Sequence, residues 1–278
     1  MAKILVIGAT GTVGRPLIAE LLAKGESVKA ASRGGQPING AEGVAFEFGK
    51  PETYDLAFEG VDRAFVLLPS GHINITELLL PLIAEAARRK VKVVFQSVFG
   101  VDADDSIPYR QVEIALEASG TPFVILRPNW FADNFHTFWK AGIAHGQIAL
   151  PAADGKSSFI DARDIAASAA AALTSDEFDG KAFNLTGPQA LSYAEAAAIL
   201  SQATGQAIDY RAIQDAAFIT TLTGAGVSTE YAGFLASIFY PVREGWTAAV
   251  TSDVETLTGA KPRSLHAYAA DHASDIRG

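Results

Sequence analysis

Two patterns of apolar residues alternate in the first half of the chain. Short apolar runs bounded by Gly, Asp or Pro predict strands, and apolar residues spaced three and four apart predict helices. The predicted strands cover residues 4–7, 27–32, 44–48, 63–68, 91–96 and 122–126. The clearest predicted helices cover residues 15–24, 73–89 and 108–118. Strands that alternate with helices predict an α/β fold, a Rossmann-type doubly wound parallel sheet covered on both faces.

The regular alternation of strands and helices ends after Arg127-Pro128. Residues 129–146 are rich in aromatic side chains, a short strand is predicted at 147–150, a helix at 161–173, and a strand that returns to the sheet at 181–185. Further helices are predicted at 194–203, 214–223 and 229–239, with a short strand at 208–211. We therefore expect an NAD(P)-binding Rossmann domain of residues 1–128 plus 157–186. A smaller, mostly helical C-terminal substrate lobe should comprise residues 129–156 plus 187–278, with a cleft where it meets the sheet.

The turn after the first strand is rich in glycine and precedes an amphipathic helix. A tight turn and a backbone that approaches a pyrophosphate both need residues without a Cβ, and the free N–H groups of a helix start favour an anion. The turn is therefore predicted to cradle a dinucleotide through Gly8, Thr10, Gly11, Thr12, Val13 and Gly14. A turn that needs glycine only for close packing is the alternative.

The second predicted strand ends without an acid that would hold a ribose 2′-hydroxyl. The chain reads Ala30-Ala31-Ser32-Arg33-Gly34 at this point. Arg33 can pair with a 2′-phosphate, a charged hydrogen bond of roughly 1.5–3 kcal/mol, and Ser32 can add a hydroxyl. We therefore predict NADP(H) as the cofactor. The alternative is that Arg33 is a solvated loop residue.

Residues just past the fourth and fifth strands should border the nicotinamide, because ligands of open α/β sheets bind outside the carboxyl ends of the strands. His72 is a candidate proton donor near neutral pH. Ser97 is a candidate hydrogen-bond donor to substrate. A solvated loop histidine and a structural serine are the alternatives. The remaining candidates for contact with the cofactor here are Leu68, Pro69 and Ser70.

Composition narrows the classes of function. A net charge of −9 and a pI near 5.0 disfavour a nucleic-acid or anionic-membrane surface. The sequence has no cysteine, which excludes disulfides and thiolate catalysis. No G-x-S-x-G or H-E-x-x-H pattern supports a hydrolase or a metal site. The apolar runs are too short to span a bilayer or to form a secretion signal, so we expect a cytoplasmic protein with no metal.

Several of these stretches together resemble a known family. Gly8-x-x-Gly11-x-x-Gly14, Ser97 at a strand end, the run from Leu116 to Pro128 and Asp161-Ala-Arg-Asp164 resemble the NmrA-like group of atypical short-chain dehydrogenase/reductases. Within that group the chain is most similar to bacterial NADPH-dependent quinone oxidoreductases and triphenylmethane reductases. The resemblance covers nearly the whole chain and implies a Rossmann fold with NADP(H). The group also contains redox-sensing regulators that bind the cofactor without turnover.

One departure from the wider superfamily is informative. The positions of its Tyr-x-x-x-Lys pair hold Asp105 and Tyr109 in this chain, and the lysine is absent. Without it, Tyr109 should stay a poor acid with a pKa near its reference value of about 10, although its hydroxyl can still bind the nicotinamide ribose. This counts against an alcohol dehydrogenase and a sugar-nucleotide epimerase, which need efficient proton transfer at oxygen.

A quinone or a cationic dye is a better match, because such an acceptor stabilises the negative charge or is neutralised by the hydride. Aromatic side chains could form a flat wall for it, with two asparagines as polar points; these are Phe99, Asn129, Trp130, Phe131 and Asn134. We thus expect an NADPH-dependent oxidoreductase that transfers hydride to a quinone-like or other electron-poor conjugated or aromatic small molecule. An NADP(H)-sensing regulator that binds a protein partner is the alternative, and a homodimer stays open.

Overall fold

The computed structural model describes residues 2–277, and its contacts divide them into two compact units. The first unit contains the residues up to Pro128 together with Ala162–Leu185 and Asp253–Ala260. The second unit contains Asn129–Asp161, Thr186–Ser252 and the residues from Lys261 onward.

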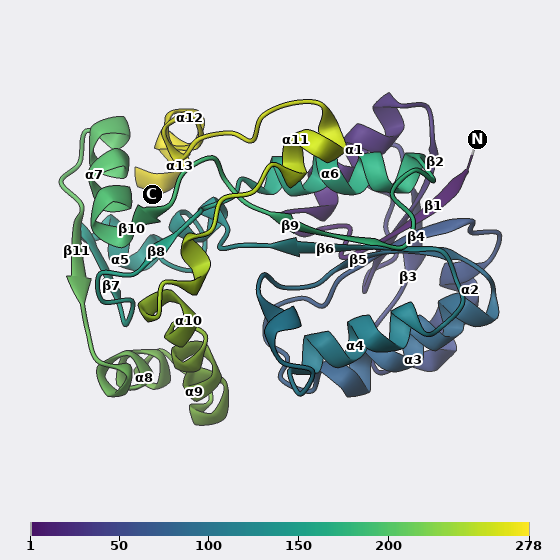
Figure 1. The fold of residues 1–278 in the computed structure, drawn as a ribbon, viewed down its shortest axis with the longest axis horizontal. Helices are drawn as coiled ribbons and strands as arrows, with labels where there is room; N and C mark the ends of the chain where they lie inside the picture. Colours follow the sequence, from purple (N-terminus) through teal and green to yellow (C-terminus); the bar gives the residue numbers. More distant parts are fainter. Residues whose placement is uncertain (1, 278) are drawn as a thin grey trace. The chain divides into compact units, whose positions relative to one another are not determined.

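The first unit is built on a seven-stranded sheet (Figure 1). All its pairings are parallel, and the strand order is β3-β2-β1-β4-β5-β6-β9. This confirms the predicted Rossmann-type, doubly wound α/β class. The strands are β1 Lys3–Ile7, β2 Ser27–Ser32, β3 Glu42–Ala45, β4 Arg63–Val66, β5 Lys92–Gln96, β6 Phe123–Pro128 and β9 Lys181–Leu185.

Helices cover both faces of this sheet. Figure 1 shows α1, α6 and α11 over one face and α3 and α4 over the other. Strands buried on both faces read as continuous apolar runs, and the four residues from Ile4 to Ile7 are fully buried. The helical elements are α1 Gly14–Ala23, η1 Pro51–Thr53, α2 Tyr54–Phe58, α3 Ile75–Arg88, η2 Val101–Ala103, α4 Pro108–Glu117, α6 Ala162–Thr174 and α11 Asp253–Thr258.

The second unit is mostly helical and has two small sheets. β7 pairs with β11 in parallel, and β8 pairs with β10 in antiparallel orientation. Its core is aromatic, with Phe135 and Tyr193 fully buried. The elements are η3 Ala132–Phe135, α5 Lys140–Ala144, β7 Gln147–Leu150, β8 Lys156–Ser157, β10 Leu191–Ser192, α7 Tyr193–Thr204, β11 Asp209–Ala212, α8 Asp215–Gly224, α9 Thr229–Ser237, α10 Tyr240–Arg243, η4 Trp246–Ala248, α12 Leu265–Asp271 and α13 Ala273–Arg277.

The observed units differ from the predicted boundaries at residues 157–161, at Thr186, which belongs to the second unit, and at residues 253–260. The chain returns to the first unit at Ala162 and not at residue 157, because Ser157 pairs with Leu191 of the second unit. The segment Asp253–Ala260 also belongs to the first unit, where α11 packs on α6 and β9. The carboxylate of Asp253 accepts a hydrogen bond of 2.6 Å from the Asn184 N–H of β9. Across residues 2–277, no helix combines the length and apolarity that crossing a bilayer requires.

Candidate functional site

The carboxyl ends of the parallel strands lie along one edge of the sheet. The register pairs Ile7 of β1 with Ala31 of β2, so the turns that leave these two strands start side by side. Val66 of β4 is likewise paired with Phe95 of β5. The residues predicted to contact the cofactor therefore share this edge in the first unit.

The glycine turn after β1 has the backbone geometry that its sequence predicts. Gly8 has a φ of +76°, and the Gly11 N–H donates a 2.9 Å hydrogen bond to the Gly8 carbonyl. A Cβ on Gly14 would lie 2.2 Å from the Gly8 carbonyl oxygen. Only glycine therefore allows α1 to begin this close to the turn.

The outer side of the turn is accessible. Thr10, Gly11 and Thr12 are exposed, whereas Val13 is buried beneath them. Arg15 donates from Nε to the Thr10 carbonyl at 3.0 Å. The first turn of α1 contains no acid, so its N–H groups and the positive end of the helix dipole suit an anion such as a pyrophosphate.

Arg33 follows β2 as an exposed cation. No carboxylate pairs with its guanidinium anywhere in residues 2–277. The Ser32 hydroxyl accepts a 3.2 Å hydrogen bond from the Gly35 N–H, which closes the turn. The guanidinium is thus available to a phosphate, while Ser32 already supports the turn.

The loop after β4 carries four of the predicted residues. Leu68 is buried, and Pro69, Ser70 and His72 are exposed. The imidazole of His72 lies 6.4 Å from the Phe48 ring, measured between centroids. Nothing else in this loop fixes a role for His72, and its assignment as a proton donor stays a prediction.

Two exposed apolar side chains lie at this edge. Ile73 follows β4 and is 37% exposed, and Val98 follows β5 and is 40% exposed. Ile73 was placed in the predicted helix 73–89, but α3 begins at Ile75 and leaves Ile73 in the loop. Exposed apolar side chains beside the strand ends suit an apolar ligand surface.

A buried polar network lies around Glu113 of α4. Arg127 donates to both carboxylate oxygens of Glu113, at 2.9 and 2.7 Å, and Arg110 adds a bond of 3.0 Å. Arg127 also donates to Asp102 at 2.6 Å. Burial opposes the ionisation of Glu113, but the bonds from Arg127 and Arg110 outweigh it and hold the pKa of that carboxyl below its ordinary value. Ser97 is only 3% exposed, and within the described residues its hydroxyl has no hydrogen-bond partner.

Tyr109 and Phe99 are the two aromatic candidates nearest to that network in the sequence. Tyr109 is the second residue of α4, is half-buried, and stacks on Phe95 with ring centroids 6.3 Å apart. Phe99 is also half-buried, and its N–H donates to the Pro128 carbonyl at 3.2 Å. Phe99 thereby joins the loop after β5 to the end of β6.

Asn129, the first residue of the second unit, is a structural asparagine. It is 4% exposed, and its Nδ2 donates to the Ser158 hydroxyl and to the Thr247 carbonyl, both at 2.8 Å. Its Oδ1 accepts a 2.9 Å bond from the Trp130 N–H. Both donors of the amide are used inside the unit, so Asn129 fixes the segment around Thr247.

The other predicted substrate residues are partly buried in the second unit. The Trp130 ring lies 4.8 Å from the Phe239 ring and 6.0 Å from the Trp139 ring, measured between centroids. Phe131 and Asn134 are half-buried at η3. Their contact with a substrate stays a prediction, and the ring contacts of Trp130 show that it also packs the core.

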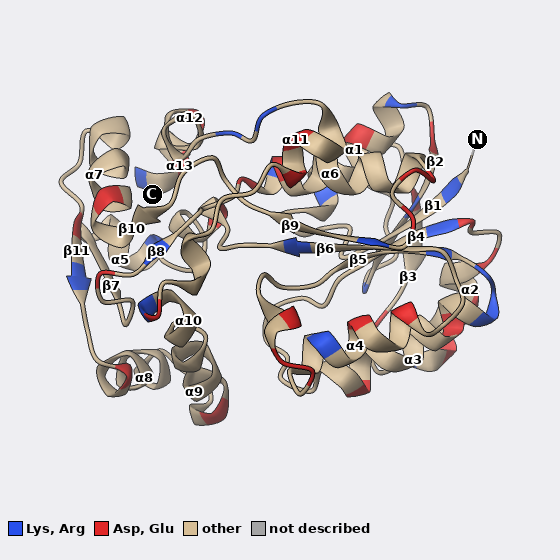
Figure 2. Cartoon of the chain, viewed as in Figure 1, with Lys and Arg blue, Asp and Glu red and all other residues tan. Residues whose placement is uncertain are grey.

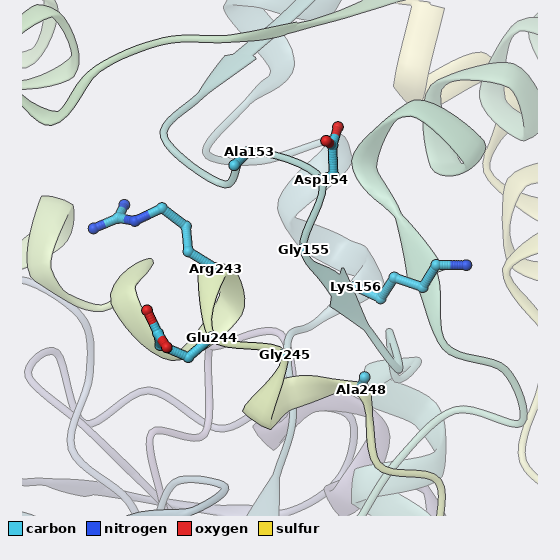
Figure 3. Close-up of a pocket in the computed structure, with 8 residues that line it drawn as sticks. All are labelled: Ala153, Asp154, Gly155, Lys156, Arg243, Glu244, Gly245 and Ala248. Atoms are coloured by element: carbon cyan, nitrogen blue, oxygen red, sulfur yellow. The ribbon is translucent and has the colours of Figure 1, made fainter.

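A cavity of about 460 Å³ lies in the second unit, between residues 153–156 and 243–248. Its charged side chains, among them Asp154 and Glu244, point in different directions (Figure 3). The Arg243 guanidinium is bound to Asp215 at 2.9 Å, outside the lining. The cavity therefore lacks the converging acid and base of a catalytic centre.

Beside this cavity are two aromatic residues that the sequence analysis did not select. Trp246 is 58% exposed and Tyr240 is 49% exposed, and their rings meet at 90° with centroids 5.5 Å apart. Trp246 stands in the polar context Arg243-Glu244-Gly245, outside any periodic apolar run. In the described part of the chain, no three His, Asp or Glu side chains gather as a metal site would require.

Comparison with known proteins agrees with this geometry. The sequence model of the NmrA-like family matches residues 1–268, which confirms the resemblance. The chain is 31% identical to an NAD(P)H azoreductase of Xenophilus azovorans, over 98% of each chain. It is also 31% identical to the prestalk A differentiation protein A of Dictyostelium discoideum, over 99% of this chain and 94% of that one. The structure of an NADPH-dependent quinone oxidoreductase of Escherichia coli complexed with NADPH shares the fold, with a TM-score of 0.82, 22% identity and coverage of 99% and 100%.

Proposed function

The chain belongs to the NmrA-like family, and from this premise we propose that it is an NADPH-dependent oxidoreductase acting on a quinone-like or other electron-poor conjugated or aromatic acceptor. The observation that carries the proposal is the carboxyl edge of β1 and β2. There an exposed glycine turn opens a helix without acids in its first turn, beside the unpaired guanidinium of Arg33. An azoreductase as a relative at 31% identity supports a conjugated acceptor.

Residues at this edge fit a dinucleotide. Gly11 and the N-terminus of α1 bind the pyrophosphate, and Arg33 binds the 2′-phosphate that distinguishes NADP(H) from NAD(H). When bound, the reduced dinucleotide supplies a hydride to the acceptor. The nicotinamide end is bordered by the residues after β4 and β5, which are Leu68, Pro69, Ser70 and Tyr109 of the following helix.

The choice of acceptor follows from the lack of an efficient proton donor among the site residues. Asp105 and Tyr109 replace the Tyr-Lys pair, so the chain lacks the strong proton donor that reduction of a simple ketone requires. A quinone that accepts a hydride becomes a hydroquinone anion whose charge is delocalised, and it takes its proton from water. Positioning of the acceptor by the protein is then the main catalytic contribution.

The test is oxidation of NADPH and of NADH by the purified protein with quinones, azo dyes, triphenylmethane dyes and activated alkenes. We expect turnover with at least one class, faster with NADPH. Arg33→Ala should weaken NADPH binding about 10- to 100-fold and leave NADH binding unchanged, because the lost charged bonds are worth roughly 1.5–3 kcal/mol. Lys24→Ala removes the same charge from the far end of α1 and is the matched control. Equal weakening for both cofactors would contradict the role of Arg33.

A non-catalytic NADP(H)-sensing regulator is the second candidate. It is favoured by the Dictyostelium relative, whose name describes differentiation and no reaction. A sensor must bind the oxidised and reduced cofactors with different affinities. Tight cofactor binding, a clear difference between the two forms and no turnover across the panel would favour the sensor over the oxidoreductase.

A further inference from the structure

Strand β11 forms the outer edge of the small β7–β11 sheet in the second unit (Figure 1). The Asp209 N–H donates to the Gly146 carbonyl at 2.9 Å, so Asp209 directs its main-chain groups towards the β7 side. Successive residues of a strand direct these groups to opposite sides. Tyr210 and Ala212 therefore point theirs away from β7, and across residues 2–277 no group pairs with them.

This open stretch of main chain is short. On its N-terminal side the Ile208 N–H donates to the Ser201 hydroxyl at 2.9 Å, and that hydroxyl also donates to the Ile208 carbonyl at 3.1 Å. On its C-terminal side the strand ends at Ala212 and α8 begins at Asp215. The open edge therefore consists of Asp209–Ala212. An interface built on four residues is small, and small interfaces are weak or transient.

The two charged residues of β11 have opposite signs and no ion-pair partner. Asp209 and Arg211 are exposed, and neither takes part in an ion pair within the described chain. Figure 2 shows the negative and the positive position in succession on β11. Side chains alternate along a strand, so both lie on the face opposite to Tyr210. The Tyr210 ring faces the core and lies 5.8 Å from the Tyr193 ring, measured between centroids.

The end strands of the large sheet differ from β11. Glu42 of β3 is paired with Lys3 of β1 at 2.9 Å. At β9, the Asn184 N–H is bonded to the carboxylate of Asp253. Folded proteins usually protect their edge strands in some way, because open main-chain groups can pair with another strand. Strand β11 combines open main-chain groups with two unpaired charges, which is what a strand needs in order to recognise a second one.

We propose that β11 pairs in antiparallel orientation with β11 of a second copy of this chain, about a two-fold axis at Tyr210. The N–H and carbonyl of Tyr210 in each copy then exchange hydrogen bonds with the same groups of the other copy. Asp209 of each copy lies opposite Arg211 of the other. These opposed residues share no main-chain bonds, and their Cα atoms approach to about 4.5 Å, so the two charges can pair.

The charge pattern is what identifies a second copy as the partner. Asp209 and Arg211 are equally distant from Tyr210 in the sequence, so a two-fold rotation at Tyr210 exchanges their positions and places unlike charges opposite each other. A strand with two like charges would repel its own copy. The axis is perpendicular to the sheet, so the faces that α7 covers lie on the same side. The contact is closed after two copies, because both use the same surface. This inference is independent of the proposed function.

Sedimentation velocity of the full chain tests the dimer, over protein concentrations from about 5 to 500 μM, the range in which weak dimers form. We expect the sedimentation coefficient of the unchanged protein to rise with concentration towards that of a dimer. Asp209→Arg places two like-charged pairs across the axis, and so does Arg211→Asp. Each substitution should weaken the dimer about tenfold or more. Both positions are exposed, so the fold should be retained, which circular dichroism verifies.

Two further samples test the register of the strands. The double variant Asp209→Arg with Arg211→Asp restores unlike pairs and should regain the dimer. An equimolar mixture of the two single variants should form a heterodimer, because one edge is then positive and the other negative. Glu230→Arg is the matched control: Glu230 is an exposed residue of α9, and the substitution changes the net charge as Asp209→Arg does. Its dimer affinity should equal that of the unchanged protein.

Amide hydrogen exchange, followed by NMR, locates the contact. The Tyr210 amide should exchange more slowly at concentrations where the dimer forms, whereas the Asp209 amide, already bonded to Gly146, should change little.

Three results would overturn the proposal. A protein that stays monomeric at every concentration has no such contact, and Asp209 and Arg211 then keep the edge from pairing. A dimer of unchanged affinity in both single variants uses another surface. Failure of the mixed single variants to associate excludes the antiparallel register. None of these measurements involves cofactor or acceptor, so the proposed function stands or fails separately.

Discussion

The polar groups buried around Glu113 in the first unit and around Thr247 in the second are held by different chemistry. In the first unit charged side chains are buried in pairs: Glu113 lies between Arg127 and Arg110, and Lys92 pairs with Asp179. In the second unit the buried polar groups around Thr247 are neutral amides and hydroxyls, and rings fill the core. Figure 2 shows both signs of charge along α3 and α4, whereas α8 and α9 are almost free of charge.

This difference in buried chemistry follows from the kinds of element that pack together in each unit. Helices α3 and α4 pack on a sheet whose strand ends carry polar loops, and the ion pair of Glu113 with Arg127 fixes α4 to β6 through two hydrogen bonds in a single geometry. The second unit consists of short segments with little regular pairing, and large rings bury much surface for each residue ordered. An ion pair therefore fixes α4 to the sheet in the first unit, and ring packing fills the core of the second.

The largest effect should come from Glu113→Ala. The substitution leaves the buried guanidinium of Arg127 without its main partner, and loss of one partner of a buried ion pair costs about 3–5 kcal/mol of unfolding free energy. Urea unfolding followed by far-ultraviolet circular dichroism measures it. All three tryptophans lie in the second unit, so their fluorescence reports that unit separately.

Glu117→Ala is the control for this prediction. Glu117 also binds Arg110, at 2.9 Å, but it is exposed, and such pairs contribute about 1 kcal/mol or less. A loss below about 1 kcal/mol in Glu113→Ala would show that the buried pair is compensated by water or by neighbours, and the contrast between the units would weaken.

A ring deletion should affect the second unit. Phe135 is fully buried, and its ring meets Trp139 at 5.0 Å and Phe159 at 5.2 Å between centroids. Phe135→Ala should cost about 3 kcal/mol, through lost contacts and the cavity that remains. The tryptophan fluorescence transition should move to lower urea. Phe138→Ala, an exposed position, should change stability by less than about 0.5 kcal/mol, and equal losses at both positions would contradict a ring-packed core.

The sequence predicts the first unit better than the second for the same reason. β1, β2 and β9 follow from apolar runs and turn residues, which are local signals, and parallel pairing follows from the alternation of strands and helices. β3 begins at Glu42, two residues before its predicted start, because Lys29 of β2 pairs with it there. In the second unit β8 and β10 are two residues each, and α12 and α13 are short and lack a strong apolar period. Their positions depend on distant partners.

The site residues, too, could be predicted where they depend on local sequence and could not where they depend on distant partners. The geometry of the glycine turn could be predicted because it depends only on the backbone of the turn itself. The position of Arg33 could be predicted because Arg33 directly follows a strand that the local sequence indicates. Asn129 was expected to contact substrate, but its amide is satisfied by Ser158 and Thr247, 29 and 118 residues away. No local pattern reveals such a partner.

The smallest effect concerns pH and again the second unit. The His136 imidazole stacks on His272 with centroids 5.1 Å apart, and its Nδ1 is bonded to the Tyr268 hydroxyl. Burial, and then the charge of His272 and of Lys140, lower the pKa of His136, while Asp275 and Asp161 act in the opposite direction. The unfolded chain, with a histidine pKa near 6.5, therefore binds this proton more readily than the folded chain.

Stability from His136 should then be complete above about pH 6.5 and be lost as the pH falls through that value towards the lower pKa of the folded state. In the protonated imidazole both ring nitrogens are donors, so Nδ1 would then donate to the Tyr268 hydroxyl. His136→Gln should remove this part of the pH dependence, seen as a smaller difference in unfolding free energy between about pH 7.5 and 5.5 by tryptophan fluorescence. His266→Gln, at an exposed position, should keep it. If both variants keep the full difference in unfolding free energy between the two pH values, that difference comes from the ion pairs of the first unit. The ring-packed core of the second unit would then be insensitive to pH.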